Sequence, residues 1–499
     1  MDELRDRLDA LEERVADLVA ARRRDDPEPD DPFRGLYISE EAAQRLLAAR
    51  EASPWSPQEV SRGEEGVPDS RLARLATSAG LDGLDLDLLL LIALPDLDSR
   101  FERLFGYLND DVTRRRASVG LALELAGISP LQHAGRTRLS PTGALALADL
   151  IVIEDMDRPF LTRGLRLPDR VTSHLLGDDG VDPGLLPYLK SPHPFAGPAA
   201  EQIARALSAG TSMLHLRERT TGTAISVGSA ALAQVGAPPI VIDLARVARD
   251  GIPEQPVSLA LREATLSGGG IVAGPVEALA ETSRRALRAV TEGRVPVVLY
   301  GSVTWDPDWA DRVPLSIEIQ PLTGDERESL WHEHLGDEDE EFSGWGGHLS
   351  LGPAQVAQAV QAARVSAASQ SRPLGPDDLR RGVRGQNAAG LEQLARRVEP
   401  EVGWDDLVLA PQVLTALREV TARARHRHTV LTTWRMRRGG GRGLGISAMF
   451  AGDSGTGKTM SAEVIAADLD LDLYTVNLAT VVDKYVGETE KNLERIFTE

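Results

Sequence analysis

The chain has 499 residues, of which 42% are apolar, so it is long enough for roughly three domains and is not expected to be disordered. It contains no cysteine, which excludes a disulfide scaffold, a thiolate metal site and a cysteine nucleophile. Its 55 basic and 76 acidic residues give a formal net charge of −21, which argues against a general binder of nucleic acid or membrane surfaces.

Residues 1–26 are predicted to form a coiled-coil helix. Leu4, Leu8, Leu11, Val15 and Leu18 are spaced 4-3-4-3 with charged residues between them. An amphipathic helix packed on its own domain would show the same pattern, and the spacing favours neither reading. This charged start is unlike a signal peptide, and no apolar run near it approaches the roughly 20 residues that span a bilayer. We therefore expect a soluble, cytoplasmic protein without a membrane partner.

Residues 27–69 are predicted to be a linker with one short helix at 40–50, because Pro and Gly recur through them. Residues 70–187 are rich in helical stripes and then contain short apolar runs at 151–153 and 160–161, which indicates a winged-helix-like domain with a small hairpin. Its basic triplet at 114–116 could touch a phosphate backbone. The acidic surroundings favour a solvated helix face, so nucleic acid is not the expected partner.

Residues 194–400 change to strands alternating with helices. Five short apolar runs are predicted strands: 212–216, 239–244, 270–273, 295–300 and 315–319. Such runs are typical of a parallel sheet covered on both faces, and a helical tail follows to about residue 398. From residue 401 to 499 the rhythm restarts, with a strand at 446–451, a helix at 458–468 and a strand at 471–478. The predicted fold class is therefore multidomain, an α-helical winged-helix region followed by two α/β P-loop modules, the second incomplete.

The segment that carries chemistry, residues 452–459, reads GDSGTGKT and matches G-x-x-x-x-G-K-[ST]. Glycines let such a loop fold around a phosphate, its backbone N–H groups point inward, and the following helix adds partial positive charge. Lys458 would bridge the β- and γ-phosphates, and the Thr459 hydroxyl would ligate Mg²⁺. We therefore predict ATP and Mg²⁺ as cofactors, with Lys458 and Thr459 catalytic. The predicted cradle consists of Gly452, Asp453, Ser454, Gly455, Thr456, Gly457, Lys458 and Thr459.

Residues 484–493 read KYVGETEKNL, and this stretch together with the P-loop resembles the AAA+ family, in particular the AAA branch proper. The resemblance implies that Tyr485, Val486 and Gly487 form a loop in the pore of a hexameric ring that grips polypeptide. A half-buried loop aromatic is the other reading of Tyr485. The resemblance also implies that Asp406 and Leu407, in the upstream WDDL segment, help to cradle adenine, with Met460 packing on the base.

Residues 194–400 resemble a degenerate first AAA+ module. Where a P-loop would stand, residues 219–223 read RTTGT, and where an Asp-Glu pair would end the third strand, residues 271–274 read IVAG. Ser302 and Thr304 could occupy the polar sensor position of the family. We expect this module not to hydrolyse ATP and to serve as a scaffold. The whole layout is similar to that of bacterial AAA+ ATPases encoded with extracellular contractile injection systems.

Hydrolysis in this family also needs an Mg²⁺-holding carboxylate, a water-orienting glutamate and an arginine from the neighbouring subunit. The family pattern places all three beyond residue 499, so we expect a truncated copy that does not itself turn over ATP. For the full-length form we predict a ring-shaped ATPase that remodels or assembles protein substrates, with injection-particle components as possible partners. The alternatives are a nucleic-acid-associated ATPase that uses the winged-helix module and a non-catalytic interaction scaffold.

Overall fold

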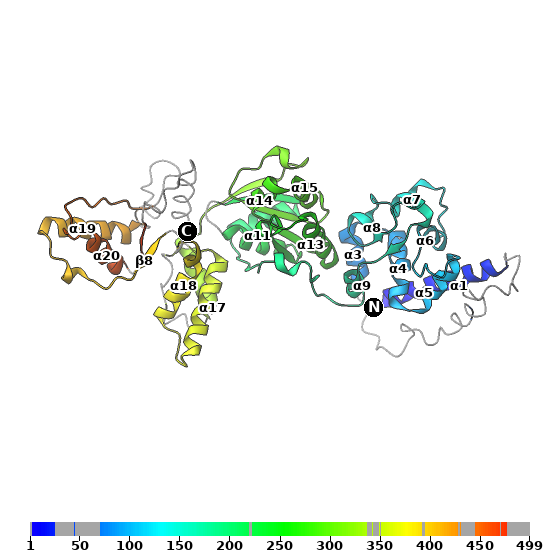
Figure 1. The fold of residues 1–499 in the computed structure, drawn as a ribbon, viewed down its shortest axis with the longest axis horizontal. Coiled ribbons are helices and arrows are strands. Elements are labelled where there is room, and N and C mark those ends of the chain that lie inside the picture. The colour runs from blue at the N-terminus through cyan, green and yellow to red at the C-terminus, as the bar shows by residue number, and fades with distance from the viewer. Residues whose placement is uncertain are drawn as a thin grey trace. The chain divides into compact units, whose positions relative to one another are not determined.

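The computed structural model describes residues 2–24, 44, 70–218, 222–336, 342, 349, 351–391, 395–427, 430, 445–469 and 471–476. The chain divides into two compact units, Met1–Pro321 and Leu322–Glu499, whose elements are labelled in Figure 1. The predicted pore loop lies outside the described residues, as does the predicted linker except for Gln44. Among the helices of the described ranges, none is long and apolar enough to cross a membrane.

The first domain of the first unit is a set of short helices with a two-stranded hairpin. Strands β1 (Val152–Ile153) and β2 (Leu165–Arg166) pair antiparallel. A hairpin is present as predicted, but the apolar run at 160–161 lies outside it in a 3-10 turn, where the N–H of Thr162 donates to the carbonyl of Pro159. The other elements are α1 (Asp2–Arg24), α3 (Arg71–Ala79), α4 (Gly83–Leu97), α5 (Arg100–Leu108), α6 (Val119–Leu125), α7 (His133–Arg138), α8 (Ala144–Leu147), η3 (Phe160–Thr162), α9 (Asp169–Leu175) and η4 (Leu186–Tyr188).

Helix α1 packs on this same domain. Its apolar stripe, Leu4, Leu8, Leu11, Val15 and Val19, is buried in one core with the apolar residues of α4. Ion pairs flank this apolar contact, because Arg7 and Arg14 of α1 lie 3.0 and 3.2 Å from the carboxylate of Asp87 in α4. The structure therefore shows the second of the two arrangements that the heptad spacing allowed, an amphipathic helix covered by its own domain.

The second domain of this unit is a five-stranded parallel sheet with helices on both faces. Its strands are β3 (Met213–Glu218), β4 (Pro239–Asp243), β5 (Gly270–Gly274), β6 (Val297–Gly301) and β7 (Leu315–Ile319), in the order β4-β5-β6-β3-β7. All five predicted strands are confirmed, with ends shifted by at most two residues. Helices α10 (Pro198–Ser208) and α11 (Thr223–Gln234) contact each other. The other helices of this domain share one apolar core with the strands: α12 (Leu244–Val247), α13 (Glu254–Ser267), α14 (Val276–Thr282) and α15 (Arg284–Glu292). Several of these helices are labelled in Figure 1.

The segment between the two domains closes one edge of this sheet. Leu189 forms an antiparallel bridge with Ile242 of the edge strand β4. The backbone N–H of Lys190 donates to the carbonyl of Val241 at 2.9 Å, and its ammonium lies 3.1 Å from Asp243. The connection is therefore part of the sheet rather than a free linker.

The second unit holds α16 (Gly324–Leu335), α17 (Pro353–Ser369), α18 (Pro376–Leu391), β8 (Arg396–Val398), η7 (Trp404–Asp406), α19 (Pro411–Arg425), α20 (Lys458–Asp468) and β9 (Leu473–Thr475). Helix α20 has the predicted bounds, and β9 forms within the predicted 471–478. The helical tail assigned to the 194–400 module lies in this unit, whereas the strands of that module lie in the first. The tail was predicted to be helical to residue 398, which is wrong at its end, because residues 396–398 form β8 and pair with β9. The boundary at residue 400 stays a prediction.

The predicted strand at 446–451 is wrong. The structure assigns no strand there, and Ile446 and Met449 are 39% and 92% exposed. A strand needs a neighbour that completes its ladder of hydrogen bonds. In the described part of the second unit, the paired strands are β8 and β9, which leaves 446–451 without such a neighbour.

Candidate nucleotide-binding site

The loop of residues 452–459 has a backbone that only glycines adopt readily. Gly452, Gly455 and Gly457 have φ values of 154°, 83° and 85°, all in the region that L side chains rarely enter. A β-carbon on Gly452 would also lie 2.9 Å from Oγ1 of Thr456, which is closer than real β-carbons come. The glycine spacing of the motif is therefore required by the loop conformation itself.

The ammonium group of Lys458 reaches back across this loop. Its Nζ donates to the carbonyl oxygen of Gly452 at 2.9 Å and to that of Asp453 at 2.6 Å. The Thr456 hydroxyl donates to the same Asp453 carbonyl at 2.9 Å, which closes the turn. The positive charge of Lys458 is thus held at the loop, where phosphate oxygens could replace neutral carbonyls as its partners.

Helix α20 begins directly after the loop. Its N-cap residue, Gly457, supplies no side chain to cap the helix, so the first N–H groups of α20 are not met by a capping side chain. Thr459 is exposed in the first turn, and the Ser461 hydroxyl bonds to the Gly457 carbonyl at 2.9 Å. Uncapped N–H groups, an ammonium and an exposed hydroxyl form a donor set that fits a phosphate chain with Mg²⁺.

The WDDL segment, which was predicted to cradle adenine, lies next to the P-loop at Leu407. This residue is 5% exposed and packs in one cluster with Leu417 and Val464, and its Cδ1 would lie 3.9 Å from a β-carbon on Gly457. Asp406 is used locally, because its Oδ2 accepts the N–H of Gly403 at 2.8 Å and closes the η7 turn.

Two further predictions concern Met460 as a contact of the base and residues 485–487 as a pore loop. The Met460 side chain is 38% exposed at the start of α20, which leaves it open for contact with a base. Tyr485, Val486 and Gly487 lie outside the residues that the structure describes, so the pore-loop assignment stays a prediction.

Residues 219–223, which the sequence analysis compares with a P-loop, lead from β3 into α11 of the first unit, and the Glu218 carboxylate meets the start of α11 there. The structure describes Glu218 and Gly222, whereas residues 219–221 between them lie outside the described residues. Glu218 accepts hydrogen bonds from the N–H groups of Gly222 (3.1 Å), Thr223 (3.1 Å) and Ala224 (2.8 Å). Burial raises the pKa of Glu218, and the three N–H groups oppose this rise.

Glu218 is not among the site residues predicted from the sequence. Its signal was an acidic residue at the last position of an apolar strand, directly before a Gly-containing loop and a helix. Since a helix N-terminus attracts one anion, a carboxylate there takes the place that a phosphate occupies in a P-loop.

Neighbouring strand ends of this sheet are also occupied by internal contacts. Strand β5 ends at Gly274 without an Asp-Glu pair, and the Tyr300 hydroxyl donates to the Gly274 carbonyl at 2.8 Å. Glu277 accepts from both the N–H (3.1 Å) and the hydroxyl (2.8 Å) of Ser302. Ser302, one of the two residues assigned to the sensor position, is therefore engaged within the domain, while Thr304 is exposed.

The arginine triplet of the winged-helix domain is neutralised by its own surroundings. Each arginine lies within ion-pair distance of an acid: Arg114 with Asp111 (3.2 Å), Arg115 with Glu102 (3.5 Å) and Arg116 with Asp96 (2.9 Å). Guanidinium groups that already face carboxylates contribute less to binding a polyanion. The geometry gives no support to a nucleic-acid interface at this triplet.

Two family descriptions match the chain. Residues 2–189 match "Winged helix domain, variant", and residues 448–499 match "ATPase family associated with various cellular activities (AAA)". The first match includes α1, which agrees with its burial in the core of that domain.

Curated relatives match over about a fifth of the chain. The Peroxisomal ATPase PEX6 of Penicillium chrysogenum is 33% identical over 98 residues, 20% of this chain and 6% of the relative. The Uncharacterized AAA family ATPase y4kL of Sinorhizobium fredii is 32% identical over 101 residues, 20% of this chain and 28% of the relative. The Cell division protein C of Sulfolobus acidocaldarius is 31% identical over 107 residues, 21% of this chain and 26% of the relative. The match thus spans less than a third of each of these relatives. From these matches and the loop geometry, the chain carries a winged-helix N-terminal domain and a region homologous to the AAA-family ATPases.

Proposed function

We propose that this protein binds ATP with Mg²⁺ at residues 452–459 and that its full assembly uses ATP hydrolysis to remodel or assemble protein substrates. The observation that carries the proposal is the position of Lys458, whose ammonium is held at 2.6 and 2.9 Å from two carbonyls of a loop with three positive-φ glycines. A loop that leads into a helix and binds no ligand has no need for a lysine folded across it.

The residues of this chain would bind the nucleotide in definite roles. Lys458 would exchange its two carbonyl partners for phosphate oxygens, and the uncapped N–H groups at the start of α20 would donate to the same phosphates. Thr459 would hold the Mg²⁺, while Leu407 and Met460 would line the base. ATP supplies the phosphoanhydride bond, and these residues bind and orient it.

We further propose that the five-stranded domain of the first unit is a scaffold that does not hydrolyse ATP. Its anion position is taken by Glu218, and its strand β5 ends without a carboxylate pair. This supports a division of labour in which one α/β region binds nucleotide and the other supports the assembly.

The remaining parts of the proposal rest on the resemblance. They are a hexameric ring in the cytoplasm, a grip on polypeptide by Tyr485, Val486 and Gly487, and an association with a contractile injection particle. Replacing Tyr485 by alanine is expected to abolish substrate processing while ATP affinity stays as in the wild type. Unchanged processing would refute the pore-loop role.

The test of nucleotide binding is a titration of the chain with a fluorescent ATP analogue in the presence of Mg²⁺. Lys458→Ala is expected to weaken binding about tenfold or more, because charge-assisted hydrogen bonds to the phosphates are lost. The matched control is Lys190→Ala, one of the few other lysines, which lies in the other unit, in the segment that pairs with the edge strand β4. Equal affinity of wild type and Lys458→Ala would refute the site.

A further inference from the structure

Helix α13 of the five-stranded domain forms part of two hydrophobic cores. Its residues Val257, Ala260 and Ala264 are fully buried among the apolar side chains of its own domain. Leu266, near the end of the same helix, is 1% exposed and belongs to the core of the winged-helix domain, and helix α3 of that domain contacts α13. Moving either domain away from α13 would therefore return buried apolar surface to water, which is unfavourable.

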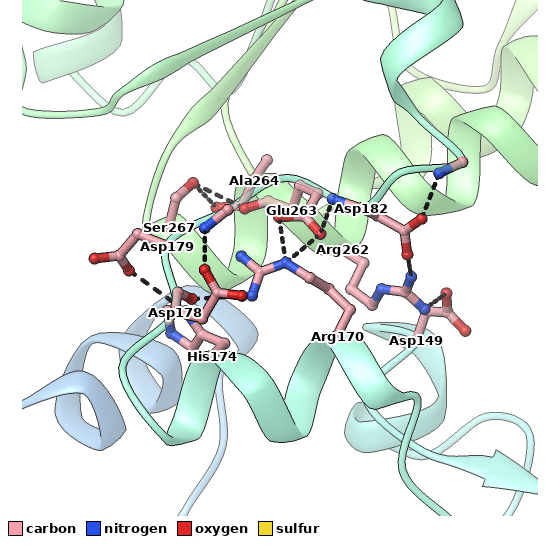
Figure 2. Close-up of polar contacts among 12 residues, drawn as sticks. Asp149, Arg170, His174, Asp178, Asp179, Asp182, Arg262, Glu263, Ala264 and Ser267 are labelled. Atoms are coloured by element: carbon pink, nitrogen blue, oxygen red, sulfur yellow. Dashed lines mark hydrogen bonds and ion pairs between the residues drawn. The ribbon is translucent and has the colours of Figure 1, made fainter.

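Buried ion pairs tie the same helix to the winged-helix domain, as Figure 2 shows. Arg170 of α9 lies 2.9 Å from Glu263 of α13, and Arg262 of α13 lies 3.0 Å from Asp149 and 2.6 Å from Asp182. Arg262 and Glu263 are only 5% and 3% exposed. A charge at such a depth is costly unless its partner stays in place, so these pairs favour one arrangement of α9 on α13.

The connection from α9 to α10 is fixed to the five-stranded domain at several points. Leu185 is buried in the core of that domain, and Leu189 pairs with Ile242 of β4. Farther along, Phe195 is 6% exposed, and its N–H donates to the carbonyl of Ser226 in α11 at 3.2 Å. A hinge needs loop residues that are free to change their backbone angles. Because this connection is anchored along its length, it is not built as a hinge.

We infer that the winged-helix domain and the five-stranded domain form one rigid body, in which α13 is the coupling helix. Domains of one chain are expected to move relative to each other unless their interface is extensive and apolar. Here a shared helix, buried ion pairs and an anchored connection all oppose such motion. The winged-helix domain is therefore a fixed platform: a protein bound to it is held at one distance and orientation from the sheet. This coupling lies within the first unit and does not depend on the proposed ATP site.

The first test measures a distance between the two domains in the full chain. Since the chain has no cysteine, spin labels can be attached at Ala134→Cys in α7 and Glu201→Cys in α10, which are both exposed positions. Double electron–electron resonance is expected to give one narrow distance distribution. The matched control pair, Ala134→Cys with Arg103→Cys, lies within the winged-helix domain and gives the width that labels on a single domain produce. An interdomain distribution much broader than that of the control would overturn the rigid body.

A second measurement tests the role of α13. A fluorophore is attached to Ala134→Cys in one sample and to Glu201→Cys in another, and each sample is unfolded with urea. We expect the same midpoint from both labels. Leu266→Ala is expected to lower both midpoints by the same amount, because the helix that carries this side chain links the two cores. Leu266→Val leaves a smaller cavity and replaces Leu266→Ala if that variant does not fold. The exposed Arg288→Gln of α15 is the control and should shift neither midpoint.

Two outcomes of the unfolding measurement would contradict the coupling by α13. In the first, the two labels report different midpoints in the otherwise unchanged chain. In the second, Leu266→Ala lowers only the midpoint reported by the label in the winged-helix domain. Either outcome would show that the two domains unfold independently. Neither would bear on nucleotide binding, because residues 452–459 lie in the other unit.

Discussion

The carboxylate of Glu218 accepts the backbone N–H of Ala224 at 2.8 Å and so caps helix α11 from the preceding strand. Glu218→Ala would leave the N–H groups of Gly222, Thr223 and Ala224 without this buried acceptor. We expect the free energy of unfolding to fall by about 2 kcal/mol, measured by urea denaturation. Glu218→Gln keeps one acceptor oxygen and should lose less. The control, Glu292→Ala at an exposed position, should unfold as the wild type does.

Burial makes His215 a source of acid sensitivity. Its ring lies 5.6 Å from that of Trp305, neither ring nitrogen has a hydrogen-bond partner among the described residues, and burial lowers its pKa from 6.5 to about 4. Between these values the unfolded chain binds a proton that the folded chain does not. The free energy of unfolding should therefore decrease as the pH falls from 6.5 to 4, by about 3 kcal/mol from this group.

Replacing this histidine tests the assignment. His215→Leu should remove about half of the slope in denaturation curves recorded between pH 4 and 7, because burial also lowers the pKa of His174 to about 4, while stability at pH 7 changes little. The exposed His133→Leu is the control and should retain the slope. A slope in His215→Leu that is as steep as in the wild type would show that His215 does not contribute to it.

The positive φ of Gly457 predicts a specific cost of adding one methyl group. Gly457→Ala places a β-carbon at a φ of 85° without a severe clash, because the nearest atom is 3.8 Å away. We expect backbone strain of about 1–2 kcal/mol and a weaker affinity for ATP, measured by the same fluorescence titration. Gly445→Ala adds the same methyl group where nothing lies within 4 Å, and should bind as the wild type does.

The buried pair of Arg170 and Glu263 predicts a strongly non-additive result. Arg170→Met alone leaves the Glu263 carboxylate buried without its partner, so we expect a loss of about 3–5 kcal/mol in the free energy of unfolding. The double variant Arg170→Met with Glu263→Leu removes both charges and should lose much less. Additive losses in this double-mutant cycle would show that the two residues do not act as a pair.

The burial of α1 in its own domain predicts that the free energy of unfolding does not depend on protein concentration. Leu11→Ala empties a core position and should cost about 2–4 kcal/mol, independently of protein concentration. Were the heptad stripe instead the seam of a dimer, the loss would grow on dilution, which sedimentation and denaturation at two concentrations would detect.

The parallel sheet and helix α20 could be predicted because their signals are local. The apolar runs around Val241, Val272 and Val298 have the length and spacing of buried strands, and Lys458 follows a glycine pattern that starts a helix. The segment at 446–451 has the same local signal, yet the structure places no strand there. The apolar side chains of this segment indicate only that it tends to be buried. A strand also requires a neighbouring strand to hydrogen-bond with, and the local sequence does not specify that neighbour.

The parts of the sites that could not be predicted depend on distant contacts. Glu218 is one of 76 acidic residues, and it caps α11 only because the folded chain brings the first N–H groups of that helix to its carboxylate. Arg170 and Glu263 are 93 positions apart, and no periodicity indicates that they form a buried pair. The stripe on α1 could be recognised as apolar, but the surface that covers it is set by tertiary packing.

The bridge from Leu189 and Lys190 to strand β4 determines how this protein can be divided. A fragment that begins at residue 194, where the pattern of strands and helices starts, would lack both residues and present the β4 edge to other chains. Such an excised domain would be prone to self-association for a reason unrelated to its own core. Expression boundaries for the five-stranded domain therefore belong upstream of Leu189, within residues 2–189 that match the winged-helix description.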